Sequence, residues 1–393
     1  MLFLLFLSAL VAPTGSGDAR CGSSTACASD ADRGYVLHEW GTFTTVAGSN
    51  GVLLEGLSYD DHALPDFVLQ RTESHAGFDG VRCKMETPVI YFYSDREREL
   101  RVQVGFQPGI LTQWYPQVHE LYPPAGPGPT ALRGGLLDWG KILVLAPGEG
   151  RDRLPPVGRA WNWEHARAVD ANVILRRTPT DQYERFLFYR GLGSFALPLS
   201  ASSRADGVLR LANGGPEPLP GAIVLARDGK HLRARRLDGL APGQSTHLVL
   251  RELGEIDLAS LMALTARLLE EQGLYPLEAQ AMVHTWQQSY FETDGLRVLY
   301  PLPRAEVDWL LPLRVSPPPR ESVRVLVARV DVITPAMEQA ALAILARIRT
   351  AKEARAQLGR FALPLLSRLE SLAEDGRERE HVRELTRLLE QTF

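Results

Sequence analysis

The sequence predicts an α+β fold that is mostly β, and three observations support this prediction. Alternating and β-branched runs fill most of the chain between positions 35 and 252. Segments with helical periodicity follow, and this periodicity returns from position 334 to the end of the chain. The 393 residues are 45% hydrophobic and 23% charged, as in globular proteins with a sizeable core.

The N-terminus has the pattern of a secretory signal peptide. Its opening run, MLFLLFLSALVA, lacks charged side chains and precedes the small and polar stretch PTGSGDA. A membrane-spanning helix needs about 20 apolar residues, so this run is too short to cross a bilayer. We therefore expect residues 1–19 to be a signal peptide and residues 20–34 a flexible linker. The mature protein is expected in the periplasm or secreted, without a transmembrane segment. The alternative is an apolar helix or strand that belongs to the fold.

Residues 35–194 are expected to form a β-rich, β-sandwich-like domain. The strands expected in it are YVLHEWGTFTTV, PVIYFYS, ELRVQVGF, KILVLAP and ERFLFYRGL. Between them, PPAGPGPTALRGG and GEGRDRLPPVGR are rich in glycine and proline, which indicates loops.

Residues 195–252 are expected to form a further β module. Four strands, GVLRLANGG, GAIVLARDG, HLRARRLDG and STHLVLREL, follow at regular spacing, and a turn with glycine ends each of the first three. This arrangement resembles the immunoglobulin-like β-sandwich of many exported proteins. The resemblance concerns architecture alone and implies no activity.

Helices are expected in the rest of the chain. Residues 253–333 are interpreted as an α/β segment with a helical hairpin, because Asp257 suits an N-cap and Pro276 suits the first turn of a second helix. Thr334 opens the C-terminal region, residues 334–393, where two or three amphipathic helices are expected.

Charge and cysteine content limit the classes of partner. The net charge is −4 and the arginines are interleaved with acidic residues, so no nucleic-acid partner is expected. Cys21 and Cys27 lie close enough in sequence to close a small loop, and Cys83 is the alternative partner for either, so the pairing stays open. No GxSxG, Walker or HExxH sequence is present.

One functional hypothesis is a metal-dependent hydrolase with its site in residues 35–190. Imidazole and carboxylate groups suit zinc or another divalent ion, which would be the cofactor. The donors that this hypothesis uses are His38, Asp61, His62 and His75. Glu39 or Glu86 would act as the general base, a role that suits a half-buried carboxylate with a raised pKa.

Each of these residues also has a structural interpretation. His38 and Glu39 are neighbours on a predicted strand, so they point to opposite faces and do not bind one metal ion together from a regular strand. His38 would then hydrogen-bond a backbone group and Glu39 would pair with an arginine. Glu86 would form a buried ion pair with a nearby arginine.

Aromatic residues give the second functional hypothesis. Two tryptophans one residue apart on a strand face the same side, where they can stack on a sugar ring or a peptide. The ligand-binding candidates are Trp114, Tyr115, Trp161, Trp163 and Arg167. The alternative is that these aromatic side chains fill a gap between domains.

Three stretches, HEWGTFTT (38–45), KMETPVIYFY (84–93) and ERFLFYRGLG (184–193), resemble a family of exported bacterial proteins. The resemblance implies export and carries no activity or functional residue to this chain. The leading prediction is therefore an exported binding or assembly protein that recognises a protein or a cell-envelope glycan. Whether the protein is an enzyme stays open.

Overall fold

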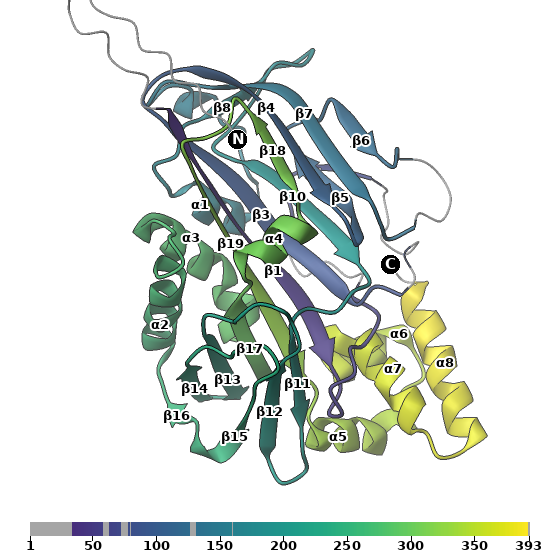
Figure 1. Ribbon diagram of the computed structural model, residues 1–393. Helices are drawn as coiled ribbons and strands as arrows, with labels where there is room; N and C mark the ends of the chain where they lie inside the picture. Colours follow the sequence, from purple (N-terminus) through teal and green to yellow (C-terminus); the bar gives the residue numbers. More distant parts are fainter. Residues whose placement is uncertain are drawn as a thin grey trace, which may run out of the picture. The chain divides into compact units, whose positions relative to one another are not determined.

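The computed structural model describes residues 34–57, 63–71, 78, 80–125, 131–158 and 160–391, and Gly34–Phe393 group into one compact unit (Figure 1). The predicted signal peptide, almost all of the linker, Cys21 and Cys27 lie outside the described residues. The described part has the mostly β, α+β architecture that the sequence predicts.

The elements follow one another along the whole described chain. The strands are β1 (Tyr35–Ala47), β2 (Leu69–Gln70), β3 (Cys83–Ser94), β4 (Arg98–Phe106), β5 (Gly109–Tyr115), β6 (Glu120–Tyr122), β7 (Gly135–Val144), β8 (Ile174–Arg176), β9 (Gln182–Glu184), β10 (Leu187–Gly193), β11 (Leu199–Ser203), β12 (Val208–Asn213), β13 (Ala222–Asp228), β14 (His231–Leu237), β15 (Ser245–Val249), β16 (Gly254–Glu255), β17 (Gly295–Pro301), β18 (Leu313–Ser316) and β19 (Glu321–Val332). The helices are α1 (Trp161–Arg167), α2 (Leu258–Glu270), α3 (Pro276–Trp286), α4 (Arg304–Leu310), α5 (Pro335–Leu345), α6 (Ala351–Leu358), α7 (Ala362–Leu372) and α8 (Gly376–Glu390), with a π-helical turn η4 (Gln287–Phe291) and 3-10 turns η2 (Arg151–Arg153), η3 (Leu250–Glu252) and η5 (Gly359–Phe361).

The described strands form three sheets. The central sheet has ten strands in the order β16-β14-β13-β17-β19-β1-β3-β10-β5-β2. A six-stranded sheet has the order β18-β4-β7-β8-β9 with β6 paired to β7, and a three-stranded sheet has the order β11-β12-β15. In the central sheet, β1 runs parallel to β19 and antiparallel to β3.

Two hydrophobic cores cover the two faces of the central sheet. Phe43 of β1 shares a core with Trp139 of β7 and Leu209 of β12, so the two smaller sheets pack on this face. Trp40 points to the other face and shares a core with Trp163 of α1 and Trp286 of α3. Helices α1–α3 therefore cover one face of the central sheet, and the two smaller sheets cover the other in a sandwich-like arrangement (Figure 1).

The four strands expected between 195 and 252 all form, but they are divided between two sheets. β12 and β15 pair within the small sheet, whereas β13 and β14 extend the central sheet through β17. The reason is the burial of β13 on both faces. Val224 packs in the core with the smaller sheets, and Ile223 and Leu225 pack in the core with the helices.

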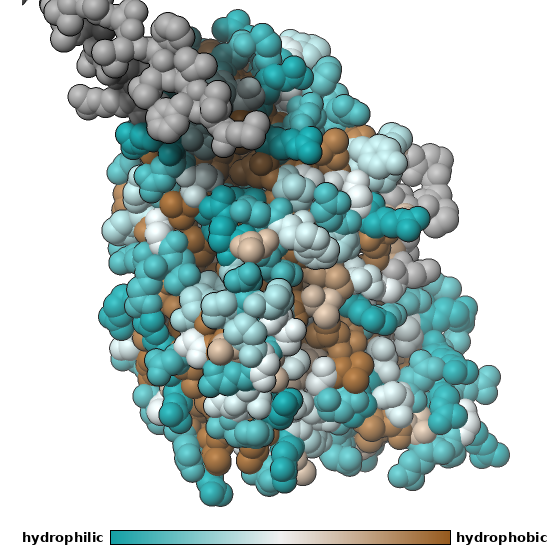
Figure 2. Space-filling view, viewed as in Figure 1, coloured by the Kyte–Doolittle hydropathy of each residue, from teal (hydrophilic) through white to brown (hydrophobic). Residues whose placement is uncertain are grey.

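The helical hairpin forms as expected. Asp257 caps α2 by accepting a hydrogen bond of 2.7 Å from the backbone N–H of Ser260. Pro276 opens α3, and the α-helix ends in the π-helical turn η4. Hydrophilic side chains cover the exposed sides of α2 and α8 (Figure 2).

The C-terminal region contains four α-helices, α5–α8, rather than the two or three that were expected. The first expected helix divides because Thr350 caps a new one, accepting a hydrogen bond of 3.2 Å from the N–H of Glu353. A separate hydrophobic core holds these helices against β1, through residues such as Val46. None of the helices in the described residues has the length and hydropathy needed to cross a membrane.

Candidate functional site: an aromatic pocket

Three neighbouring strands lose their regular pairing at one place in the central sheet. The register of β1 and β3 shifts between Trp40 and Thr42, and that of β10 and β3 shifts between Phe188 and Gly191. The pairing of β10 with β5 also shifts beside Gly191. Bulges of this kind redirect side chains, and they are common next to functional sites.

Two glycines allow these irregularities. A Cβ atom at Gly41 would lie 2.8 Å from Cα of Pro88, and one at Gly191 would lie 2.5 Å from the carbonyl oxygen of Ile110. Only glycine tolerates such close approach of backbone. Both glycines belong to the stretches HEWGTFTT and ERFLFYRGLG that the sequence analysis singled out.

Thr87, on the strand between them, has a backbone conformation that is rare for its residue type. Its φ of 51° is in the left-handed region, and among the described residues other than glycine no other φ is positive. The conformation is costly because Thr is β-branched and because Pro88 favours an extended backbone at the residue before it. Strain of this kind persists where the surroundings fix it, and it is frequent at ligand sites.

A pocket lies over this irregular region, on the face that carries the helices. The empty space within it and in the solvent at its open mouth totals about 440 Å³, and its lining is almost entirely apolar. The strands contribute the side chains of Trp40, Thr87, Val89, Phe188 and Arg190, and Phe186 lies just before β10. The walls come from α1 (Asn162, Trp163 and Ala166), Ala160, Thr285 of α3, and Ala63 and Leu64.

Two polar atoms of uncharged side chains in the pocket lining lack hydrogen-bond partners within the described part of the chain. They are Nε1 of Trp40, which is fully buried, and Oδ1 of Asn162. The hydroxyl of Tyr91 lies beside Trp40 but donates to the carbonyl oxygen of Ala166 at 2.8 Å, and no hydrogen bond of normal geometry joins it to the indole. A buried polar atom without a partner costs free energy, so these two atoms add to the cost of the strained backbone at Thr87.

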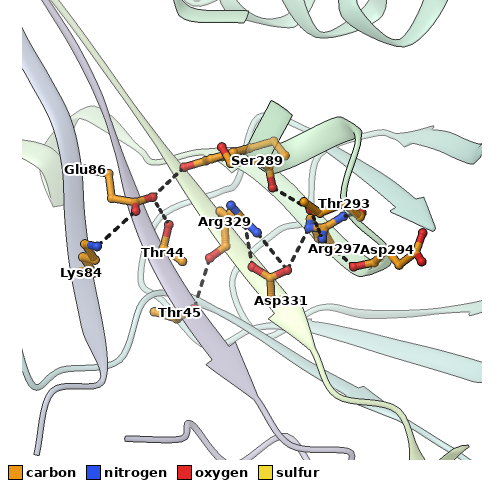
Figure 3. A network of polar contacts seen from close by, with 11 residues as sticks. Thr44, Thr45, Lys84, Glu86, Ser289, Thr293, Asp294, Arg297, Arg329 and Asp331 are labelled. Atoms are coloured by element: carbon orange, nitrogen blue, oxygen red, sulfur yellow. Dashed lines mark hydrogen bonds and ion pairs between the residues drawn. The ribbon is translucent and has the colours of Figure 1, made fainter. Parts of the chain in front are cut away.

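A network of buried charges anchors the strand next to Thr87 (Figure 3). Oε2 of Glu86 accepts hydrogen bonds from the hydroxyls of Thr44 at 2.8 Å and Tyr290 at 3.1 Å, and Oε1 lies 3.6 Å from Nζ of Lys84. Burial by itself would raise the pKa of the Glu86 carboxyl. The charges of Lys84, Arg329 and Arg190, with the hydrogen bond from Thr44, bring this pKa below its usual value.

The network continues to the π-helical turn η4 and to strands β17 and β19. Arg329 lies over the ring of Tyr290, with its guanidinium carbon 4.2 Å from the ring centre, and its Nε donates to Oδ2 of Asp331 at 2.6 Å. Nε of Arg297 lies 2.9 Å from Oδ1 of Asp331. Burial lowers the pKa of Arg297 to about 10, although Asp331 favours its charged form. Glu86 is thus stabilised in its charged form by fixed contacts within the fold. A structural role for this carboxylate fits the contacts better than the role of a general base with a raised pKa.

His38 and Glu39 point to opposite faces of β1, as the alternation predicts. Nδ1 of His38 lies 2.7 Å from Oε2 of Glu278 on α3, a side chain rather than the backbone group that was expected. Glu39 accepts hydrogen bonds from Nε of Arg324 and from the Tyr189 hydroxyl, and so forms the buried ion pair with an arginine that was the alternative to catalysis. The two side chains do not meet at one site.

The proposed metal ligands give no cluster in the structure as far as it is described. Asp61, His62 and His75 lie outside the described residues. Within the described ranges, no three side chains of the types His, Cys, Asp and Glu converge on one point. The metal hypothesis therefore stays a prediction.

The aromatic candidates have different positions. Trp161 and Trp163 belong to helix α1 and not to a strand, so the expected same-side pair is wrong, since residues two apart on a helix do not share a face. The side chain of Trp161 lies outside the described atoms. Trp163 lines the pocket, and its Nε1 donates to Oε2 of Glu184 at 2.8 Å. Arg167 binds the same carboxylate at 2.7 Å and so joins α1 to the end of β9.

Trp114 and Tyr115 are both buried at the end of β5. Trp114 belongs to the core under the smaller sheets. Tyr115 packs on Phe67, with 4.6 Å between ring centres, and Phe67 in turn contacts Trp163. Tyr115 thus supports the pocket wall from behind.

Sequence reasoning missed most residues of the pocket. The missed residues include Trp40, Thr87, Phe186, Phe188 and Arg190. One signal for these residues was present in the sequence. Gly41, Pro88 and Gly191 each follow a pocket residue within a predicted strand, and a glycine there indicates a bulge or a close approach of backbone.

No family model matches the chain, and no curated protein matches it. Among solved structures, the yeast delta-COP-I mu-homology domain complexed with a Dsl1 WxWxV peptide is 7% identical, with a TM-score of 0.27, and covers 76% of this chain and 96% of that chain. A second structure of the yeast delta-COP-I mu-homology domain is 7% identical, with a TM-score of 0.26 and the same coverage. Scores this low carry no argument about function.

Proposed function

We propose that this chain is an exported binding protein that holds an apolar side chain of a protein partner in the aromatic pocket. The observation that carries the proposal is the almost entirely apolar lining of the pocket, to which the aromatic side chains of Trp40, Trp163, Phe186 and Phe188 contribute. Two further features support the proposal. The strained backbone of Thr87 and the register shifts of β1, β3 and β10 lie at the same pocket, and such strain is frequent at ligand sites.

The lining favours a protein side chain over a glycan. Sugar recognition needs an accessible aromatic face and polar groups for the hydroxyls of the sugar ring. Here Trp40 is 0% exposed and Trp163 is 6% exposed, and few polar groups reach the pocket surface. An apolar side chain fits this lining without leaving hydroxyl groups unpaired.

Export is the second part of the proposal, and it depends on the apolar run at the N-terminus. The test is cell fractionation of a C-terminally tagged protein, followed by N-terminal sequencing of the mature chain. Recovery from the periplasm or medium with residues 1–19 removed supports export. Recovery from the cytosol with Met1 in place contradicts it.

The binding proposal can be tested with 5-fluorotryptophan and ¹⁹F NMR. The signals of Trp40 and Trp163 are assigned by substituting each with Phe, and Trp309, which is exposed on α4, serves as an internal reference. We expect N-acetyl-L-phenylalaninamide to shift the Trp40 and Trp163 signals in a saturable way. N-acetylglycinamide and N-acetylglucosamine should leave them in place.

Two matched substitutions control for indirect effects. Ala63 and Ala259 are both exposed, but only Ala63 lines the pocket. Ala63→Phe should block the pocket and abolish the shifts, whereas Ala259→Phe on α2 should not. Equal shifts in both variants, or no shift with the parent protein, would show that the pocket does not bind apolar side chains.

A further inference from the structure

We infer that the edge of strand β15 is a second docking site, which adds an extended, acidic segment of a protein partner to the three-stranded sheet. The segment pairs with the backbone of β15 and places a carboxylate beside His247 and Arg210. Strand β15 ends this sheet on the side away from β11 (Figure 1). The inference goes beyond the pocket and does not depend on it.

Strand β15 directs part of its backbone away from β12. The N–H of Leu250 donates to the carbonyl oxygen of Gly207 at 2.9 Å. At the other end of the pair, the N–H of Asn213 donates to the carbonyl oxygen of Gln244 at 2.9 Å. Because the bonded residues of an antiparallel pair alternate, the even-numbered residues of β15 bond β12 and the odd-numbered residues face away from it. The odd-numbered residues are Ser245, His247 and Val249, and their backbone groups make no other hydrogen bond within the described chain.

The opposite edge of the same sheet, β11, is covered by other parts of the chain. The N–H of Leu199 donates to the hydroxyl of Tyr300 at 3.2 Å. The N–H of Ser203 donates to the carbonyl oxygen of Ser49 at 2.9 Å. Proteins protect open edges with charged side chains, proline or bulges. Strand β15 reads STHLV and pairs with β12 without a register shift, so it lacks lysine, proline and a bulge and is open to strand addition.

The outer face of the three-stranded sheet determines which partner fits. Leu209 and Leu248 point into the core, so the alternate residues point to solvent. These solvent-facing residues are serine, valine or alanine except for Arg210 and His247, which are both exposed and lie opposite each other in the pairing of β12 with β15. Neither of the two has an ion-pair partner among the described residues. The site therefore presents donors and positive charge without an acidic group.

An added strand brings a carboxylate to both side chains. Residues directly opposite each other on neighbouring strands share a face, so a glutamate paired with His247 projects onto this outer face. Strands lie about 4.8 Å apart, so this glutamate is about 10 Å from the backbone of Arg210, two strands away. A glutamate and an arginine side chain that extend toward each other span this distance. A second copy of the chain would bring serine, histidine and valine to this place and no carboxylate, so an acidic partner fits better.

The test uses a fluorescein-labelled heptapeptide of alternating valine and threonine with a central glutamate, and measures its binding to the full chain by fluorescence anisotropy. We expect saturable binding. The N–H groups at peptide positions 2 and 6 share the direction of the central residue and face β15, so methylating them should weaken binding at least about tenfold. Methylation at positions 3 and 5, which face away, should leave binding unchanged. Glutamine in place of the glutamate should weaken binding about threefold, the effect of an exposed ion pair.

Substitutions in the chain locate the site. His247→Pro removes an outward N–H but no bond to β12, and should weaken binding about tenfold, whereas His247→Ala keeps the N–H and should retain most of the binding. Arg210→Met should abolish the preference for glutamate over glutamine. The matched control is Arg314→Met, at an exposed position of the edge strand β18, which should keep this preference. If His247→Pro does not fold, the two methylated peptides still test strand pairing.

Three outcomes would overturn the inference. Equal binding of the two methylated peptides, or no binding of any peptide, would show that β15 does not accept a strand. Equal binding of the glutamate and glutamine peptides would show that the partner is not recognised by its acidic residue. A dimer in analytical ultracentrifugation that His247→Pro disrupts and His247→Ala retains would identify a second copy of the chain as the occupant. The proposal for the pocket is tested separately and survives each of these results.

Discussion

The ion pair between Glu39 and Arg324 offers the sharpest test of how the motif around His38 stabilises the fold. Glu39 is 0% exposed and Arg324 is 6% exposed, and the pair joins the adjacent strands β1 and β19. Arg324 also binds Oδ1 of Asp308 on α4 at 2.7 Å and the carbonyl oxygen of Leu311 at 2.7 Å. The substitution Glu39→Gln keeps the shape of the side chain and removes its charge.

The expected loss of stability follows from the burial of the pair. Breaking a buried ion pair from one side costs about 3–5 kcal/mol, because the remaining charge is left in a poor environment. Asp308 still neutralises part of the Arg324 charge, so we expect a loss near the lower end, about 3 kcal/mol. The exposed pair between Glu99 and Lys141, with 2.7 Å between its charged atoms, should contribute less than about 1 kcal/mol.

The assay is urea unfolding at neutral pH, with Glu39→Gln compared to the matched control Glu99→Gln. The double variant Glu39→Met/Arg324→Met should lose less stability than Glu39→Gln, because it leaves no charge without a partner at this position. A Glu39→Gln variant whose free energy of unfolding is within about 1 kcal/mol of the Glu99→Gln variant would refute the reasoning.

Three further predictions concern single residues. Burial and the charge of His284 lower the pKa of His165, against the effect of Glu164, so protonation of His165 favours the unfolded chain. Stability in urea should therefore fall as the pH drops below about 6.5, and His165→Gln should reduce this dependence, whereas an unchanged dependence would contradict it. Thr87→Gly should raise the free energy of unfolding by about 1 kcal/mol, since it relieves the positive φ; a loss of stability would show that Thr87 is not strained. Burial, with the charge of Glu86, raises the pKa of the Cys83 thiol well above its usual range, so iodoacetamide should label Cys83 only in denaturant, as measured by mass spectrometry.

The periodic elements could be predicted from the sequence, but the pocket could not. The alternation of β1 gives opposite faces for His38 and Glu39, and Asp257 and Pro276 mark the starts of two helices, because these patterns depend on neighbours in sequence. The division of β12 and β13 between two sheets depends on β17, which follows some seventy residues later along the chain by their printed bounds. A bulge likewise depends on the partner strand. A glycine within a strand therefore indicates a bulge, but the sequence does not tell which residues lie opposite that glycine.

Trp40 differs from the other polar side chains of the same sequence motifs because its indole N–H has no hydrogen-bond partner in the described residues. Glu39 and Glu86 are engaged by hydrogen bonds and charges from within the chain, which explains them as parts of the fold. Nε2 of His38 has no partner in the described residues either, but His38 does not line the pocket and packs on Tyr275 with 4.2 Å between tilted ring centres. Trp40 has both properties, an unsatisfied donor and a place in the pocket wall. The strained Thr87 and the register shifts of β1, β3 and β10 lie at the same pocket, and such irregularities are frequent next to ligand sites, which agrees with the proposed binding role.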